Sequence, residues 1–201
     1  MNDSLSDEQR QWEQQSEVHG PAFEPPGNLP PRLVIFGAVP LAAALCRAVA
    51  AIDWRVYVID PRERFARAEL FPDAERVVVG WPEEAFAELG ACDETTAVVL
   101  LTHAPELDDP ALMIALRSPA FYVGAMGSRR TQGRRRERLA QARLGESELA
   151  RLSGPAGLDL GGVTAAEAAL AILAEAVAAL HGRDGARLTR SENAIHVAGR
   201  P

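Results

Sequence analysis

The stretch GAMGSRR holds the residues best suited to bind a charged ligand. Gly124 and Gly127 free the backbone, and Ser128 can cap a helix whose first N–H groups would face an anion. Arg129 and Arg130 follow directly, and guanidinium groups can hold a phosphate in bidentate fashion. The stretch therefore predicts an anion-binding turn.

A second group of residues partly matches a dinucleotide-binding fingerprint. Gly37 ends a short apolar run, and Asp60 ends the next one, where a ribose-binding acid would stand. Val39 occupies the place of the second glycine, and Pro40 lacks an N–H that could donate to phosphate. Asp60 has a second interpretation as the residue that begins an Asp-Pro turn. Binding of NAD or NADP is therefore an alternative hypothesis here.

Single polar residues elsewhere allow a functional or a structural interpretation. His103, after Thr102, could bond a ligand or transfer a proton, or it could be a capping or core histidine. Asp108 is expected to cap a helix. Arg134 and Arg138 are expected on a solvated helix side, paired with carboxylates. We find no Ser-His-Asp context, H-E-x-x-H, Walker loop or metal cluster, so no catalytic or metal-binding residue is predicted.

The elements that would position these residues alternate along the chain. Short apolar runs predict strands at about 33–36, 55–60, 76–79, 96–101 and 121–123. Helices are expected at about 40–52, 83–89, 108–116, 128–142 and 164–180. This alternation predicts an α/β fold, a Rossmann-like doubly wound parallel sheet of about five strands flanked by helices. Ligands bind such sheets at the carboxyl ends of the strands, where the candidate residues fall.

A glycine-dense loop, GPAGLDLGG, precedes the last helix. Thr164 and Glu167 have the spacing of a capping box at the start of that helix. The loop could line the same cleft as the candidate residues, or it could be a connector that needs special backbone angles. The sequence leaves both interpretations open.

Composition narrows the class of protein. The 201 residues carry a net charge of −7 without any lysine, which argues against general nucleic-acid binding. Neither a membrane-length apolar run nor a secretory signal is present, so a cytoplasmic location is expected. Cys46 and Cys92 lack metal or redox spacing and are expected to be reduced, small apolar residues.

Three regions follow from the changes in composition. Residues 1–30 are expected to be a disordered Gln/Pro-rich arm, and residues 31–182 the Rossmann domain. Residues 183–201 are expected to form a polar C-terminal tail, in which Ala194–Val197 could add a short edge strand.

Five segments together resemble the C-terminal Rossmann domain of the XdhC/CoxI family, whose members are xanthine dehydrogenase accessory proteins. The segments are RLVIFGA, WRVYVIDPRERFARAELFPDAERV, TAVVLLTHAPELDDPAL, FYVGAMGSRRT and GPAGLDLGGVTAAEAALAILAEAVAALHG. The resemblance runs from about Arg32 to Gly182 and keeps the order of the motifs.

The resemblance implies a chaperone that binds molybdenum cofactor (molybdopterin) and inserts it into a molybdenum hydroxylase such as xanthine dehydrogenase or carbon monoxide dehydrogenase. Family members cooperate with a cysteine desulfurase and often form homodimers; neither nucleic acid nor membrane is an expected partner. Such a role involves no metabolite turnover. The cofactor-binding residues expected here are Gly37, Asp60, His103, Gly124, Gly127, Ser128, Arg129 and Arg130.

Two departures from the family pattern affect this expectation. The first turn of family members reads like FGAGHVA, whereas this chain has Val39 and Pro40 in place of Gly-His. Family chaperones also have an N-terminal domain with glycine- and cysteine-rich motifs. Two expectations follow: either a separate N-terminal-type XdhC protein supplies that domain, or this form has lost or changed cofactor binding. The alternatives are an NAD(P)-binding oxidoreductase and a non-catalytic interaction subunit of a maturation complex.

Overall fold

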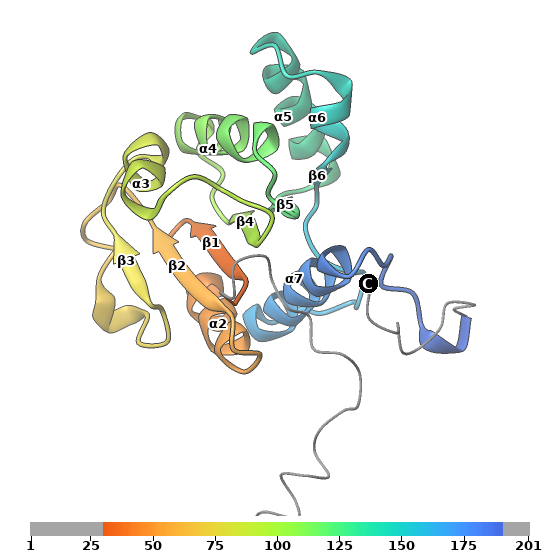
Figure 1. The fold of residues 1–201 in the computed structure, drawn as a ribbon, viewed down its shortest axis with the longest axis horizontal. Coiled ribbons are helices and arrows are strands. Elements are labelled where there is room, and N and C mark those ends of the chain that lie inside the picture. Colours follow the sequence, from red (N-terminus) through yellow and green to blue (C-terminus); the bar gives the residue numbers. More distant parts are fainter. Residues whose placement is uncertain (1–29, 191–201) are drawn as a thin grey trace, which may run out of the picture. The chain divides into compact units, whose positions relative to one another are not determined.

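The computed structural model describes residues 30–190. Their core is one parallel sheet with the strand order β3-β2-β1-β4-β5-β6 (Figure 1). The strands are β1 (Arg32–Phe36), β2 (Arg55–Ile59), β3 (Arg76–Val78), β4 (Thr96–Leu100), β5 (Tyr122–Ala125) and β6 (Leu152–Ser153). Successive strands from β1 to β3 extend the sheet to one side, and strands from β4 to β6 extend it to the other. The boundary between β1 and β4 is therefore the switch point of a Rossmann sheet. The predicted fold class is confirmed, with six strands in place of about five.

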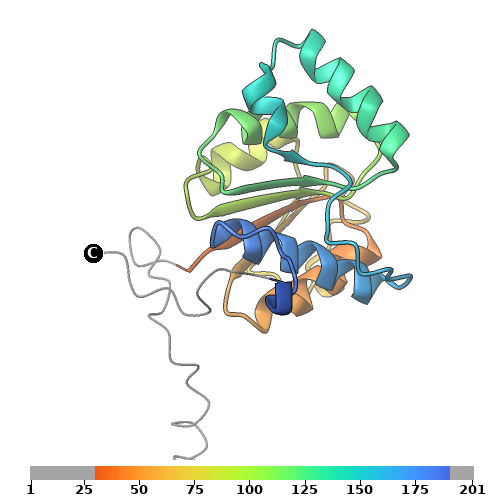
Figure 2. The same ribbon diagram turned by 90° about the vertical axis from the view of Figure 1, so that its right-hand side faces the viewer.

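Helices cover both faces of the sheet. They are α2 (Pro40–Ala50), α3 (Pro82–Leu89), α4 (Pro105–Arg117), α5 (Arg129–Gln141), α6 (Glu146–Ala150) and α7 (Ala165–Leu180). Helices α2 and α7 pack side by side on one face, and α3, α4, α5 and α6 lie on the other (Figures 1 and 2). Short 3-10 turns are η1 (Ala68–Leu70) and η2 (Leu188–Arg190). Residues 1–29, most of the expected arm, and the expected edge strand at 194–197 lie outside the described residues.

The register brings the ends of the central strands to one line. Phe36 at the end of β1 pairs with Ile59 of β2 and with Leu100 of β4. The arrowheads point to a single edge, where α5 and α7 begin (Figure 2). The residues that follow β1, β2, β4 and β5 therefore share that edge.

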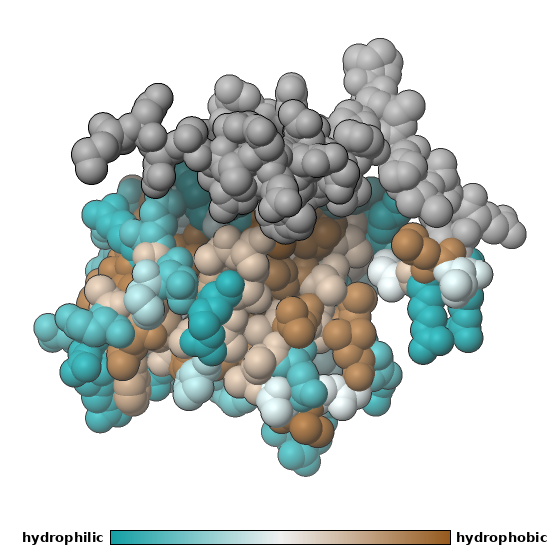
Figure 3. Space-filling model, turned by 90° about the horizontal axis from the view of Figure 1, so that it is seen from below, coloured by the Kyte–Doolittle hydropathy of each residue, from teal (hydrophilic) through white to brown (hydrophobic). Residues whose placement is uncertain are grey.

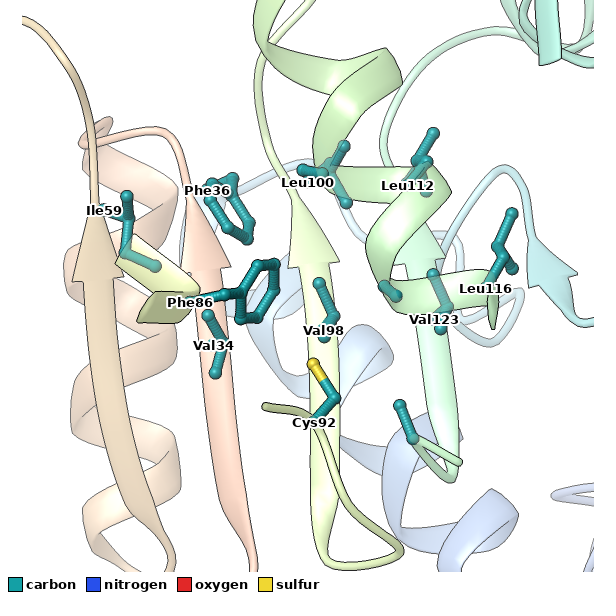
Figure 4. Close-up of a cluster of buried hydrophobic side chains, with 14 of the residues drawn as sticks. Val34, Phe36, Ile59, Phe86, Cys92, Val98, Leu100, Leu112, Leu116 and Val123 are labelled. Carbon is teal, nitrogen blue, oxygen red and sulfur yellow. The ribbon is translucent and has the colours of Figure 1, made fainter. Parts of the chain in front are cut away.

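Two apolar clusters hold the layers together. Above the sheet, Phe86 of α3 packs on Phe36 with 5.4 Å between ring centroids, and Leu112 and Leu116 of α4 cover β4 and β5 (Figure 4). Below it, residues of α2 and α7 pack on the other side of the central strands. Central strands buried on both faces have continuous apolar runs in their sequence, which is why their positions could be predicted.

The cysteines behave as expected from the sequence. Cys46 belongs to the lower cluster and Cys92 to the upper one, and both are buried and free. Burial raises the pKa of the Cys46 thiol to about 12, because the thiolate would lose its hydration. The side chain therefore acts as a small apolar residue.

Some helix starts and ends differ from the expected ones. Helix α4 begins at Pro105, so Asp108 lies inside its first turns and does not cap it; that expectation was wrong. Pro105 fits the first helical position, where no N–H is needed. The capping box at Thr164 is confirmed, because its Oγ1 accepts from the Glu167 N–H at 3.2 Å and Glu167 accepts from the Thr164 N–H at 2.8 Å.

No helix within residues 30–190 combines the length and the apolar character that crossing a bilayer requires.

Candidate functional site

Gly37 lies where the two halves of the sheet meet. It has a φ of 111° directly after β1, and a Cβ there would come within 2.6 Å of Cγ2 of Thr102, which follows β4. Its N–H donates to the carbonyl of Ile59 in β2 at 2.8 Å. Glycine is therefore required both for the left-handed backbone and for the close approach of the β1 turn to the β4 end.

Asp60 is fully buried at the end of β2, and both of its oxygens are occupied. Oδ2 accepts from the Ala38 N–H at 2.9 Å and from Nη2 of Arg62 at 2.7 Å. Oδ1 accepts from the backbone N–H of Arg62 at 3.0 Å and from its Nε at 2.8 Å. Asp60 thus forms the turn that the Asp-Pro sequence indicated and also fastens the β1 turn to β2.

The electrostatics of Asp60 follow from these contacts. Burial alone would raise the pKa of this carboxyl, but the hydrogen bonds from Arg62 and from two backbone N–H groups stabilise the carboxylate more strongly. The net effect is a pKa below the ordinary value for aspartate. Asp60 is therefore a fixed anion whose partner Arg62 is 47% exposed.

A second aspartate, Asp108, connects the ends of β4 and β5 through a buried network. Thr102 donates its hydroxyl to Oδ1 of Asp108, and Nη2 of Arg135 on α5 donates to Oδ2 at 2.7 Å. The side chains of Asp108 and Arg135 are 2% and 1% exposed. Burial raises the pKa of Asp108, against the opposing hydrogen bonds from Thr102 and Arg135.

Arg135 also supports the loop that follows β5. Its Nη1 donates to the carbonyl of Met126 at 3.1 Å and to Oε1 of Gln132 at 2.7 Å. Gln132 in turn donates from Nε2 to the carbonyl of Ala125 at 2.9 Å. Among the described residues, Nε of Arg135 is buried without a hydrogen-bond partner. These contacts hold the β5 turn and the first turns of α5 against α4.

The predicted anion-binding turn at residues 127–130, the anion turn, has the local geometry that its sequence indicated. Gly127 has a φ of 130°, and Ser128 caps α5 by accepting from the Thr131 N–H at 3.2 Å. Arg129 and Arg130 are the first two helical residues, and both are exposed. Their backbone N–H groups have no intrahelical acceptor, because the first turn of a helix leaves them unpaired. An anion at this point would meet the two N–H groups, and the two exposed arginines that carry them add positive charge to the turn.

Two other predicted site residues are placed by the structure as follows. Gly124 is inside β5 and not in the turn, and a Cβ on it would come within 2.6 Å of the Tyr122 hydroxyl. This glycine makes room for a neighbouring side chain of its own strand. His103 follows β4 as expected and its side chain is exposed.

The arginines farther along α5 have separate roles. Arg138 makes a bidentate pair with Asp109, at 2.7 and 2.9 Å, which confirms the expected carboxylate pairing. Arg134 is exposed, as expected of a solvated helix side.

The glycine-dense loop after β6 reaches the same edge of the sheet. Glu175 of α7 holds it, because its Oε2 accepts from the Gly157 N–H at 2.7 Å and from the Tyr122 hydroxyl at 2.5 Å. A small pocket of about 220 Å³ lies between Met126, this loop and the start of α7. The loop is thus a connector that also walls this pocket, whose lining contains none of the predicted cofactor-binding residues.

A larger pocket of about 480 Å³ opens beside the β1 turn. Its lining includes Arg62, Phe65 and Phe71, none of which was singled out from the sequence. The sequence signal for Arg62 was the tripeptide Asp60-Pro61-Arg62. An Asp-Pro turn brings the arginine, which comes two residues after the aspartate, next to the carboxylate. Arg135 had no comparable signal, because it stands in an arginine-rich helix whose composition is typical of a solvated surface.

The chain matches the family model described as the XdhC Rossmann domain over residues 33–176. This range includes nearly all of the sheet and every predicted site residue.

Two named relatives and one solved structure resemble most of this chain. The chain is 28% identical over 169 residues to a probable subunit of xanthine dehydrogenase from Bacillus subtilis, covering 81% of this chain and 49% of the relative. It is 30% identical over 144 residues to the molybdenum cofactor insertion chaperone PaoD of Escherichia coli, covering 72% of this chain and 38% of PaoD. A solved structure named as a xanthine dehydrogenase from Bacillus halodurans superposes with a TM-score of 0.65 at 26% identity, covering 81% of this chain and 45% of the other. The chain thus spans about half the length of these relatives or less.

Proposed function

Because the chain belongs to the XdhC family through its Rossmann domain, we propose that it binds molybdenum cofactor and delivers it to a molybdenum hydroxylase. Xanthine dehydrogenase and carbon monoxide dehydrogenase are the proposed kinds of client. The name of PaoD, an insertion chaperone for this cofactor, supports a role in enzyme maturation. When bound, the cofactor supplies the molybdenum centre that the client enzyme uses.

The observation that carries the proposal is the anion turn at the start of α5. Molybdopterin ends in a phosphate, and the turn offers two unpaired N–H groups beside the guanidinium groups of Arg129 and Arg130. Gly127 and Ser128 shape the turn, and the buried pair of Asp108 and Arg135 fixes the helix behind it. The residues present therefore fit the phosphate end of the cofactor. Gly37, Asp60, His103 and Gly124 remain proposed members of the wider cleft.

The test is a direct titration of the purified chain with molybdenum cofactor under anaerobic conditions. Replacing both arginines, R129A/R130A, removes two charge-assisted contacts and should weaken binding by about tenfold or more. The matched control is R47A/R134A, which removes the same charge from two exposed arginines, one on α2 and one farther along α5. Equal affinity in R129A/R130A and the wild type would exclude the turn as the phosphate site.

The oxidoreductase alternative has a separate test. A nicotinamide dinucleotide needs a phosphate cradle at the β1 turn and a free carboxylate at Asp60, whose oxygens already accept four hydrogen bonds. We therefore expect millimolar NAD or NADP to leave the thermal unfolding midpoint unchanged. A saturable rise in that midpoint would favour the alternative.

A second candidate role is that of an interaction subunit that docks on a hydroxylase without binding cofactor itself. The observation in its favour is the apolar surface seen in Figure 3, together with the exposed side chains of Leu160, Val163 and Leu170. A cysteine desulfurase, a separate N-terminal-type XdhC protein and a second copy of the chain are further proposed partners. Recovery of a hydroxylase by tagged R129A/R130A as efficiently as by the wild type would show docking without cofactor.

A further inference from the structure

Helix α5 concentrates positive charge in an otherwise acidic protein. Its 13 residues include six arginines and one carboxylate, a net charge of +5 in a chain whose total is −7. The helix packs against α4 and α6 above the sheet and exposes its opposite side to solvent (Figures 1 and 2). The arginines that lie on this exposed side determine which partners the charge can attract.

Three of the six arginines are used within the protein. Arg135 bonds a buried aspartate of α4, and Arg138 pairs with a second aspartate of that helix. Arg136 donates to the carbonyls of Leu149 and Leu152 at 2.7 and 2.8 Å. These contacts fix the position and the rotation of α5, so its opposite side is presented in a constant orientation.

The other three arginines, Arg129, Arg130 and Arg134, are exposed. Within residues 30–190 their side chains make no ion pair and no hydrogen bond, although the chain has seven more acidic than basic residues. Arg130 and Arg134 are four residues apart on the helix, so they lie on one side of it with a rise of about 6 Å between them. Their guanidinium groups are therefore available to carboxylates from outside the chain.

A glycine lies among these arginines and has no structural reason within the chain. Gly133 is an exposed residue in the middle of α5, where glycine destabilises a helix relative to alanine. A Cβ at this position would meet no atom within 4 Å, so no neighbouring group requires its absence. A bare position on a helix lets a second backbone approach closely, which gives this glycine a use only in a complex.

The composition of this side of α5 favours a protein over a membrane or a nucleic acid. Its exposed residues are Arg129, Arg130, Gly133, Arg134, Glu137, Ala140 and Gln141. A helix that lies in a bilayer surface needs a large apolar face, and binding of single-stranded nucleic acid needs aromatic side chains; this side of α5 has neither. The helix is only about 20 Å long, and the acidic remainder of the chain would repel a longer phosphate backbone or an anionic bilayer.

We propose that the arginine face of α5, formed by Arg129, Arg130, Gly133 and Arg134, docks an acidic helix of a partner protein. The partner helix packs over Gly133, and its carboxylates pair with the guanidinium groups on both sides of the glycine. Complementary charges of this kind steer association and fix the register of the complex. Gly133 and Arg134 lie outside the anion turn, so docking through them does not depend on cofactor binding.

The experiment is a fluorescence anisotropy titration of the full chain with a labelled, alanine-based helical peptide of about 16 residues. Glutamates at every fourth position give its carboxylates the spacing of Arg130 and Arg134, and the control peptide has glutamine in their place. At low ionic strength we expect the glutamate peptide to bind about tenfold more tightly than the control, with an affinity that falls as salt is added. Short duplex DNA and phosphatidylglycerol vesicles should bind more weakly than the glutamate peptide. No preference for glutamate, or tighter binding of DNA or vesicles, would overturn the proposal.

Substitutions outside the anion turn then locate the surface. Arg134→Glu replaces an attraction by a repulsion and should weaken peptide binding about tenfold, whereas Arg47→Glu makes the same charge change on α2 and should have an effect of about twofold at most. Gly133→Trp should block the approach of the peptide, whereas Ala50→Trp adds the same bulk to an exposed position of α2 and should not.

Gly133→Ala tests whether the fold itself needs this glycine. Because the added methyl group meets no atom, the thermal unfolding midpoint should rise. A lower midpoint, or wild-type affinity for the glutamate peptide in either Arg134→Glu or Gly133→Trp, would overturn the assignment of this face as a docking surface.

Discussion

Two aspartate–arginine pairs stand at the carboxyl edge of this sheet, and they differ in almost every respect. Asp60 and Arg62 are two residues apart, and the arginine side chain is 47% exposed beside a pocket. Asp108 and Arg135 come from two helices, and both side chains are almost completely buried. Hydrogen bonds lower the pKa of Asp60 despite its burial, whereas burial raises the pKa of Asp108.

The two aspartate–arginine pairs therefore perform different tasks. The local pair, Asp60 and Arg62, holds the turn after β2 and leaves the partly exposed guanidinium of Arg62 in the wall of a pocket. The long-range pair fastens the β4 end to the β5 turn and α5, where it supports the anion turn without reaching the surface. The Asp60 pair thus presents a partly exposed guanidinium beside a pocket, whereas the Asp108 pair is an enclosed support.

The largest expected effect is at the buried pair. Asp108→Ala leaves the Arg135 cation buried without its partner and should lower the free energy of unfolding by about 3–5 kcal/mol, measured by urea denaturation. The matched control is Asp109→Ala, which breaks the partly exposed pair with Arg138 and should cost about 1 kcal/mol or less. Equal losses in the two variants would show that burial of the first pair has no energetic consequence.

Gly37 connects the two regions, and its substitution should have the next largest effect. Gly37→Ala places a side chain at a φ of 111° and 2.6 Å from Cγ2 of Thr102, so we expect a loss of about 1–3 kcal/mol in unfolding free energy. The double variant with Thr102→Ser removes that methyl group and should recover part of the loss. A double variant that loses as much as the sum of the single ones would place the strain in the backbone alone.

The smallest expected effect is the pH dependence due to Asp60. Its pKa is lower in the folded protein than in the unfolded chain, so its contribution to stability is complete above the unfolded value of about 3.9 and is lost as the pH falls through the folded value. Unfolding free energies of the wild type should therefore fall between about pH 5 and the acid limit of folding. Asp60→Asn should reduce that slope by at most about 1.4 kcal/mol per pH unit. An unchanged slope would mean that Asp60 does not titrate differently on folding.

Local patterns predicted most elements of this fold. Buried parallel strands appear as continuous apolar runs, and α5 begins where Ser128 provides a cap, so both could be found from neighbouring residues. Strand β6 has two residues, whose pairing with Val123 and Gly124 leaves no periodic pattern to detect. Asp108 resembled a helix cap in sequence because a Pro follows soon after it, yet the helix already begins at Pro105.

The order of residues along the chain was enough to predict the alternation of strands and helices, and with it the edge where Gly37, Asp60, His103 and the anion turn gather. Which charged side chains are buried and which are free depends on packing in the folded protein. Arg135 and Arg134 are neighbours of the same type, but one is buried against an aspartate 27 positions away and the other is exposed. Their difference depends on which side of α5 packs on α4, and that is set by contacts between residues far apart in the chain, which no local pattern encodes.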